Sequence, residues 1–548
     1  MQLEQPLDPG VLDPAMSFST SRQWPGERHP TRWDVDDANK NPGTSFLDRF
    51  RVAVLHSEGA EEDILLDSDS AINSSEDLDL QNAFRYVYPM ALLSDVPPTP
   101  PDHELIRLQS AFSTSFQQHA FLNSVANLSS SSSSIPPYLQ FAYACLASVT
   151  SGSVDTSPYN ATEGSSTPEV SATLFVTGVN LWSVMLEVDN REARLLDAVI
   201  AASLLSTYGV LSADNNDWKK ASGVLCNVVT ISRRLHLSDG YSPLYHGDDV
   251  ANKDFTAKSA LISYMILVDT LHAVHFGIAP NYSTSELFIR MPSSNHHFRT
   301  IYNSLLHGCK VPCDVRDQED ALILLTAILN DVIHVNCNFL SLQFPEIVSS
   351  QAINGHRQDA VNPSVDRHLI DKNQKLRNPW APLTAGSEFC RLRVHLLAAL
   401  SRWEDHFKQH VGSDVLSLYY FSQLQLQCPE IWELPHLAGY GTASINSSER
   451  AKSTAQFQIS DKAIDLPWHI LDHCDKSSRS SAPQMAIWLP IVLFLSALVV
   501  WHKIRCQTST QKKYGTLKVL GMFKNELAKL PWPCCTEMMR TLDRLMDQ

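Results

Sequence analysis

The sequence predicts an all-α protein, a multi-helix body behind a disordered N-terminal region, with polar loops between its helices. Three observations support this fold class. Only 20 of the 548 residues are glycine, whereas sheet-rich folds need many tight turns and the glycines that form them. Leucine-rich runs repeat with the three-to-four-residue spacing of helices. The chain is 44% hydrophobic and 19% charged, which is typical of a protein that buries a large core.

Residues 1–100 are predicted to form a disordered, acidic and proline-containing N-terminal region, because their apolar residues are sparse and follow no pattern. Within this region, residues 61–70 (EEDILLDSDS) place a small apolar insert among acidic residues. Such a stretch resembles a disordered activation segment, but we favour the alternative, a solvating linker. The proline-rich run at 96–101 predicts a stiff, extended break before the helical body.

The helical body is predicted over residues 101–548 and begins with an apolar stripe on one helix face, formed by Leu105, Leu108, Phe112 and Phe116. A serine loop at 129–134 precedes an apolar helix over residues 138–149, and a polar loop follows at about 150–170. Residues 172–237 have a strong helical pattern. One amphipathic helix is expected at Leu195, Leu196, Val199, Ile200 and Leu204, and another at Val224, Val228, Ile231 and Leu235.

The next predicted helix contains residues 261–271, and Gly277 and Pro280 mark its end. An apolar stripe over residues 322–339 predicts one more helix. A polar loop is expected at 354–387, followed by helices at 389–407 and around 416–426. A second polar, serine-rich loop is expected at 446–481, and two further apolar helices between residues 482 and 548.

The formal net charge of −16 indicates a protein that repels a phosphate backbone unless a local basic patch overcomes this field. Two small basic clusters are present: Arg22, Arg28, His29 and Arg32 near Trp24 and Trp33, and Lys503, Arg505, Lys512 and Lys513. A basic, aromatic arm that contacts DNA weakly is one interpretation of the first cluster. We favour a solvated tail for the first cluster and a charged surface beside a helix for the second.

The eleven cysteines lie between Cys145 and Cys535. The N-terminal residues lack the apolar run of a signal peptide, so the cysteines are expected to be free thiols in a reducing compartment. The one compact group of soft ligands, His307-x-Cys309-x3-Cys313, supplies three donors, whereas a structural zinc site takes four. We therefore expect no zinc there, and we expect Cys534 and Cys535 to be a reduced, partly buried pair.

The motifs of several enzyme classes are missing from the sequence, namely a phosphate-binding loop, a dinucleotide fingerprint, a nucleophile elbow and an HExxH helix. His296 and His297 are neighbours on a predicted loop, where adjacent side chains diverge, so a surface role is expected. We predict no catalytic, cofactor-binding or metal-binding residue and no enzymatic activity. An enzyme whose catalytic groups are dispersed along the sequence is the alternative.

The apolar run at 486–501, which a basic flank follows, is either a buried helix or a membrane span. A spanning helix needs about 20 apolar residues, and this run is shorter. We predict a buried helix of a large α-domain. The alternative is a tail-anchored helical membrane protein that uses residues 486–501.

Several short segments in the middle of the chain, which we call phrases, form a recognisable set. Residues 228–237 (VVTISRRLHL) end a predicted helix, and residues 261–270 (LISYMILVDT) form an apolar helix that reaches Asp269. Gly277-x-x-Pro280 and Met291-Pro292 follow. These phrases resemble the fungal-specific transcription factor domain, the middle homology region of fungal zinc-cluster regulators. Residues 398–403 (AALSRW) and 418–421 (LYYF) resemble later helices of the same domain, so the resemblance covers roughly residues 100–540.

The resemblance implies an all-helical regulatory domain of a nuclear transcription regulator, of the kind that controls a biosynthetic gene cluster in secondary metabolism. Such a protein works as a homo- or heterodimer and contacts the transcriptional machinery or a DNA-binding partner. Asp269 is then expected to be a structural group that is hydrogen-bonded among apolar neighbours.

The sequence departs from the family in two places. The lead-in to the Asp269 helix offers Lys253, Asp254 and Lys258 in place of an arginine-rich stretch. No cysteine precedes Cys145, so the family's N-terminal zinc module cannot be built from these residues. The chain is interpreted as a truncated or degenerate member, or as one that acts through a DNA-binding partner, and direct contact with promoter DNA is left open.

Overall fold

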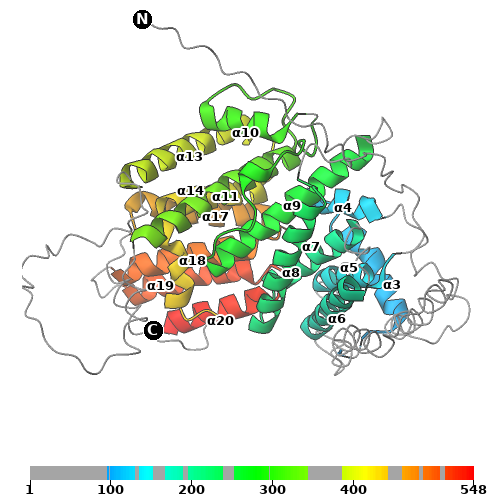
Figure 1. Ribbon diagram of the computed structural model, residues 1–548. Helices are drawn as coiled ribbons and strands as arrows, with labels where there is room; N and C mark the ends of the chain where they lie inside the picture. Colours follow the sequence, from blue (N-terminus) through cyan, green and yellow to red (C-terminus); the bar gives the residue numbers. More distant parts are fainter. Residues whose placement is uncertain are drawn as a thin grey trace, which may run out of the picture. The chain divides into compact units, whose positions relative to one another are not determined.

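Helices make up the regular structure of this protein. The computed structural model describes residues 96–97, 99–129, 135–151, 167–188, 196–238, 252–294, 296–343, 385–441, 459–479, 486–506 and 512–547, all of which belong to one unit of the chain, Ser70–Gln548. Across these ranges there are sixteen α-helices, two short 3-10 helices and one isolated bridge between Arg290 and His297 (Figure 1). The all-α prediction is confirmed. The predicted disordered region 1–100 lies almost entirely outside the described residues.

Five of the first six described helices pack together around α5 and α7, and the sixth, α4, packs against α9. The six helices are α3 (Asp102–Ser115), α4 (Leu122–Ser129), α5 (Pro137–Ser151), α6 (Thr167–Val188), α7 (Leu196–Val210) and α8 (Asn215–Arg234). α5 packs against α3, α6 and α7, and α7 also packs against α8. The predicted stripe from Leu105 to Phe116 is buried in this group.

Helix α7 corrects one prediction. The sequence analysis expects an amphipathic helix here, but every residue from Ala198 to Val210 is buried. A helix that is apolar on all sides is a core helix with neighbours all around it, and α5, α6, α8 and α9 are among those neighbours.

Helix α9 (Asn252–Phe276) joins the first group of helices to the others. It packs against α4 and α7, and also against α11 (Gln318–Gln343) and α18 (Leu489–Cys506). The segment between α9 and α11 contains the short helix η5 (Thr284–Glu286) and α10 (Phe298–His307).

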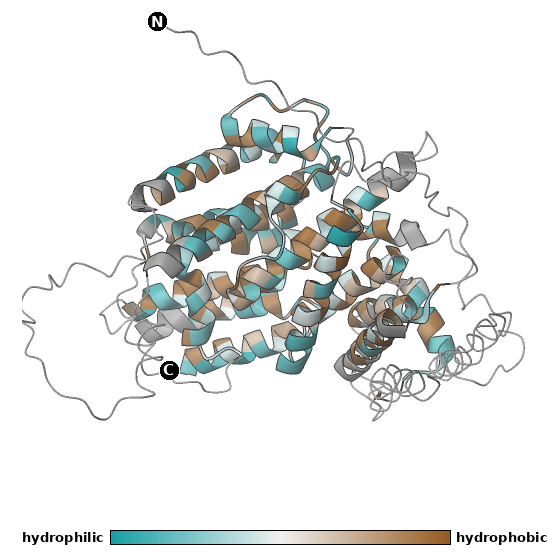
Figure 2. Ribbon diagram, in the orientation of Figure 1, coloured by the Kyte–Doolittle hydropathy of each residue, from teal (hydrophilic) through white to brown (hydrophobic). Residues whose placement is uncertain are grey.

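The later helices follow one another as a row of neighbours, which Figure 1 shows running from α10 to α20. They are α13 (Ala385–Phe407), α14 (Ser413–Gln427), η6 (Pro429–Glu433), α15 (Leu434–Leu437), α17 (Asp461–Ser478), α18, α19 (Lys512–Leu527) and α20 (Cys534–Asp547). α10 packs against α13, α13 against α11 and α14, α14 against α17, and α17, α18, α19 and α20 each against the next. In Figure 2 hydrophobic and hydrophilic positions alternate along most of these helices.

Two predicted segments are corrected by the structure. The polar loop predicted at 446–481 contains α17, which begins after Ser460, whose hydroxyl accepts a hydrogen bond from the Ala463 N–H at 3.3 Å. The region after residue 482 holds three helices, α18, α19 and α20, in place of the two expected. The loops predicted at 150–170 and 354–387 lie mostly outside the described residues. α6 begins a few residues before the predicted end of the first loop, and α13 begins shortly before the predicted end of the second.

Helix α18 contains the apolar run for which the sequence leaves two interpretations. Every residue from Leu489 to His502 is buried, and the helix packs against α9, α14, α15, α17, α19 and α20. Three described segments are long and apolar enough to cross a membrane by length and composition: Ala257–Phe276, Gln318–Asn338 and Leu489–Cys506. Most of each is buried against other parts of the protein, which is the environment of a core helix.

Candidate functional site

The phrases that carry the resemblance meet at the segment that follows α9, residues 277–294, which we call the strap. α9 ends at Phe276 because Gly277 adopts a left-handed conformation with φ +65°, which costs a residue with a side chain about 1–2 kcal/mol. The Ile278 N–H then donates to the Ala273 carbonyl at 3.1 Å. The Trp432 side chain packs against Gly277, so the close approach also requires the absence of a Cβ atom there. The predicted helix end at Gly277 is confirmed.

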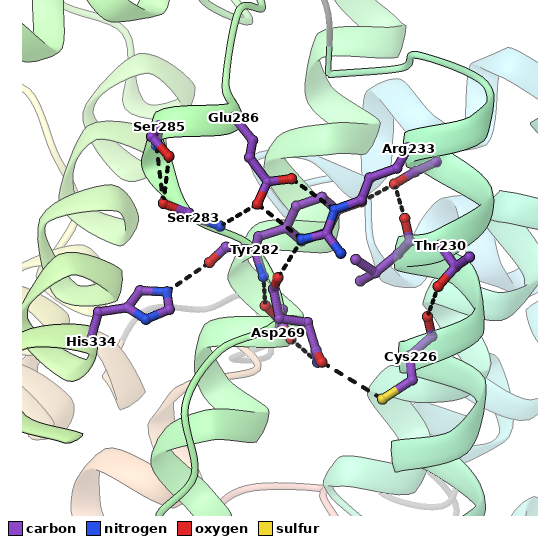
Figure 3. Close-up of polar contacts among 12 residues, drawn as sticks. Cys226, Thr230, Arg233, Asp269, Tyr282, Ser283, Ser285, Glu286 and His334 are labelled. Carbon is purple, nitrogen blue, oxygen red and sulfur yellow. Dashed lines mark hydrogen bonds and ion pairs between the residues drawn. The ribbon is translucent and has the colours of Figure 1, made fainter. Parts of the chain in front are cut away.

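Asp269, fully buried near the end of α9, holds the strap to its own helix (Figure 3). Its Oδ1 accepts a hydrogen bond from Asn281 Nδ2 at 2.7 Å, and its Oδ2 accepts one from the Tyr282 N–H at 2.8 Å. Both carboxylate oxygens therefore have donors from the strap. The expectation of a hydrogen-bonded structural carboxylate at Asp269 is confirmed.

Arg233, one of two arginines in the last turn of α8, holds the same stretch from a second helix. Its guanidinium donates two hydrogen bonds to the Glu286 carboxylate, at 2.7 and 2.9 Å, and one to the Asn281 carbonyl at 2.7 Å. Glu286 also accepts from the Ser283 N–H in a capping box around η5. Ser232, the neighbour of Arg233, hydrogen-bonds the Tyr282 hydroxyl.

Helix α11 supplies the third set of contacts to the strap. Asp331 accepts hydrogen bonds from the Thr284 hydroxyl at 2.7 Å and from the Tyr302 hydroxyl at 2.6 Å. His334 Nε2 lies 2.9 Å from the Tyr282 carbonyl, and because a carbonyl only accepts, this nitrogen donates. At the beginning of α11, Asp320 accepts from the Ser293 N–H at 2.9 Å. Three helices therefore fix the strap with charged or polar side chains.

Burial dominates the electrostatics of these carboxyl groups. It raises the pKa of Asp269 to about 6, while hydrogen bonds from Tyr282 and Asn281 and the nearby His334 act in the opposite direction. Burial also raises the pKa of Asp320 to about 6 and raises the pKa of Asp331. Removal from water disfavours the charged form, and hydrogen-bond donors favour it. With both oxygens of Asp269 and of Asp331 accepting hydrogen bonds, these groups act as braces between elements.

A second buried polar junction lies where α7, α9 and the chain after α15 meet. His275 Nδ1 lies 2.9 Å from the Val210 carbonyl, and His275 Nε2 lies 2.9 Å from the Tyr440 hydroxyl. The carbonyl only accepts, so Nδ1 carries the proton and Nε2 accepts from Tyr440. Burial lowers the pKa of His275 to about 3. Trp218 of α8 packs edge-on against this imidazole at 5.4 Å, so the ring is neutral and enclosed.

The structure does not gather the sequence's soft ligands into a metal centre. Cys309 and Cys313 are exposed free thiols, and among the described residues no group of three or more His, Cys, Asp or Glu side chains is placed to hold a metal ion. His296 pairs with Asp314 at 2.8 Å, whereas His297 is the N-cap residue of α10. His297 is exposed and His296 is partly exposed, in agreement with the predicted surface position.

All eleven cysteines are free thiols, as predicted. Cys534 and Cys535 are both buried at the beginning of α20, more deeply than the partial burial expected for the pair. The Cys534 N–H donates to the Leu211 carbonyl at 2.8 Å, so this turn joins α20 to the end of α7.

In the second basic cluster, the side chains that the structure describes are in contact with other residues of the chain. Lys503 donates to the Ile459 carbonyl at 2.9 Å, and the Arg505 guanidinium lies 5.4 Å from the centre of the Trp501 ring. The side chains of Lys512 and Lys513 lie outside the described residues, and so does the whole first cluster, Arg22, Arg28, His29 and Arg32.

The later phrases also pack together, since Trp403 of α13 stacks on Tyr419 of α14 with the ring centres 5.4 Å apart. The sequence analysis did not single out Asn281, Glu286 or His334, which complete the strap contacts. Polar residues in a segment without periodicity carry no signal for partners on distant helices, and only the capping pair Ser283 and Glu286 follows a recognisable spacing.

Comparison of the chain with protein-family models, with curated proteins and with solved structures finds no match.

Proposed function

We propose that this protein is a transcription regulator of fungal type, without catalytic activity, that acts in the nucleus through protein–protein contacts. The observation that supports the proposal is the convergence on the strap. The arginine of residues 228–237, the aspartate of residues 261–270 and the Gly277-x-x-Pro280 turn are separate phrases of the resemblance. Arg233 and Asp269 both hold Asn281, which directly follows that turn.

The charge of the chain supports a regulator that reaches DNA through a partner. A net charge of −16 opposes contact with phosphates. In the second basic cluster, Lys503 and Arg505 contact other residues of the same chain. Helical surfaces on a rigid core suit dimerisation and contact with a DNA-binding protein, and a biosynthetic gene cluster is the kind of target that the resemblance suggests.

The proposal is tested by tagging the chain in its native cell, fractionating the cell and profiling transcripts. We expect nuclear enrichment, crosslinking to chromatin and altered transcription of a defined gene set when the protein is removed. Asp269→Ala should lower the amount of protein and reproduce part of that transcript change. Asp472→Asn is the matched control, because Asp472 is an exposed residue of α17 that pairs with Lys476 one turn later, and it should leave both readouts unchanged.

Two results would contradict this function. Membrane association that resists carbonate extraction would favour the tail-anchored alternative, with α18 as the anchor. Nuclear exclusion together with an unchanged transcript profile in cells that lack the protein would remove the regulatory role altogether. Purified protein alone should bind duplex DNA weakly, with an affinity that falls steeply as salt is raised.

A further inference from the structure

An open cleft of about 400 Å³ lies between the beginning of α6, the end of α7, the beginning of α8 and the turn before α20. Asp217, Asp214, Ser212 and Tyr208 line it on the polar side, and Val176 and Pro533 are among its apolar lining residues. Small-molecule sites have volumes of roughly 300–1,000 Å³ and combine an apolar wall with a few polar groups. The volume of the cleft falls in this range and its lining is mixed in this way, while the cleft itself is wide open to solvent.

Asp217 is the group that gives the cleft its chemistry. The residue is only 5% exposed. Its Oδ2 accepts a hydrogen bond from the Ser212 hydroxyl at 2.7 Å, and its Oδ1 accepts none from the described residues. Burial raises the pKa of this carboxyl and the hydrogen bond from Ser212 lowers it. The nearby charge of Asp214 raises the pKa, and the nearby charge of Lys220 lowers it. The Oδ1 atom is accessible to solvent, so a cation or a hydrogen-bond donor in the cleft can reach it.

Helix capping does not account for the position of Asp217. Asp214 is the N-cap residue of α8, and its own carboxylate accepts from the Asn216 N–H at 2.9 Å. A residue in the first turn often reaches back to the N–H of the N-cap residue. Here the Asp214 N–H donates to the Ser212 hydroxyl at 3.2 Å instead, so the Asp217 carboxylate is left to line the cleft.

We propose that this cleft binds a small organic ammonium ion, whose cationic head pairs with Asp217 and whose apolar body lies against Val176 and Pro533. Asp214 at the same opening adds a second negative charge that favours a cation over an anion. The hydroxyls of Ser212 and Tyr208 can accept the ammonium hydrogens that Asp217 does not take. This site goes beyond the proposed function and stands whether or not the protein regulates transcription.

The test is calorimetric titration of the purified full chain with benzylammonium, methylammonium and butylammonium ions, and with benzyl alcohol as the neutral match for the first. We expect saturable binding of benzylammonium and weaker or no binding of benzyl alcohol. Asp217→Asn should weaken benzylammonium binding by about thirtyfold, the low end for removing one partner of a buried charge pair. Asp472→Asn, far from the cleft in sequence and on the exposed face of α17, should leave the affinity unchanged.

A second variant keeps the test informative if Asp217→Asn does not fold. Ala172→Trp places a large ring on the half-buried α6 wall of the cleft and leaves Asp217 in place, so it should abolish binding without changing the helical circular dichroism. Affinity should also rise as the pH rises through the ionisation of Asp217. The proposal is overturned if no ammonium ion in the series binds at millimolar concentration, if benzyl alcohol binds as well as benzylammonium, or if Asp217→Asn binds as the unaltered chain does.

Discussion

Asp269 is the residue whose removal most directly tests the strap. Asp269→Ala leaves Asn281 Nδ2 and the buried Tyr282 N–H without acceptors, and each such donor costs about 1–3 kcal/mol. We expect the free energy of unfolding to fall by that amount for each donor, measured by urea unfolding. Asp269→Asn keeps one carbonyl acceptor and should lose less. Equal stability of the alanine variant and the unaltered chain would show that the strap does not depend on this brace.

The same carboxyl group predicts a pH dependence. Folding raises the pKa of Asp269 from its ordinary 3.8 to about 6, so the folded state favours the protonated acid. Its contribution to stability is complete below about pH 4 and is lost as the pH rises through 6. The stability difference between the unaltered chain and Asp269→Asn should therefore shrink on going from pH 4 to pH 7, by on the order of 2 kcal/mol. A difference that grows over this range would contradict the assignment.

His275 predicts the opposite trend. Burial lowers its pKa from 6.5 to about 3, so the folded state favours the neutral ring. That stability is present above pH 6.5 and is lost as the pH falls toward 3. Between pH 6 and pH 4, the unaltered chain should lose about 1.4 kcal/mol more per pH unit than His275→Gln does, measured by urea unfolding at each pH. Parallel pH profiles would mean that the ring is not held neutral.

At the scale of an element, the end of α9 depends on one glycine. Gly277→Ala forces a side chain into the left-handed conformation and places its Cβ 2.9 Å from the Trp432 ring, so we expect a loss of at least about 1–2 kcal/mol in thermal or urea unfolding. Gly223→Ala is the matched control in α8, where nothing lies within 4 Å of the new Cβ. That substitution in a helix interior should stabilise the protein by up to about 1 kcal/mol.

The sequence predicted elements well where a helix has one apolar face. α3 follows its stripe of leucines and phenylalanines, and α9 ends at the glycine that marks its boundary. α17 was missed because its mean composition is polar and a proline, Pro467, lies inside it. It nevertheless buries residues such as Ala463 and Ile470 and packs against α14 and α18, and this packing outweighs the weak local signal. α7 was predicted to have one apolar face but is buried on all sides, because apolar residues at helical spacing do not show whether the opposite face is also buried.

The candidate site was predictable only in part. Asp269 and Gly277 stand out because a carboxylate in an apolar run and a glycine after a helix each have a physical requirement. Their partners Asn281, Glu286 and His334 come from other elements, and polar contacts between elements leave no periodic trace in the sequence. The cleft at Asp217 was missed for the same reason, because helices α6, α7 and α8 and the turn before α20 form it together.

At the scale of the whole molecule, thiol accessibility tests the packing of the core. Cys226, Cys309, Cys313, Cys390 and Cys506 are exposed, whereas Cys145, Cys428, Cys474, Cys534 and Cys535 are buried. Burial also raises the pKa of Cys145 and Cys428, so less of each is the reactive thiolate. A maleimide should modify the first five in the native protein, with the second five reacting only in denaturant, as read by peptide mass spectrometry. Rapid native labelling of Cys534 or Cys535 would mean that α20 does not dock as described.

The hydrogen bond between Cys534 and Leu211 has a consequence for protein synthesis. α7 is buried along most of its length, and the residue that follows it is hydrogen-bonded to the first residue of α20, which the ribosome makes far later. At ~5–20 residues per second, the nascent chain waits roughly tens of seconds before this contact can form. We therefore expect ribosome-bound chains that stop before residue 534 to be held by chaperones, and release of the chaperone to follow the emergence of α20 from the exit tunnel.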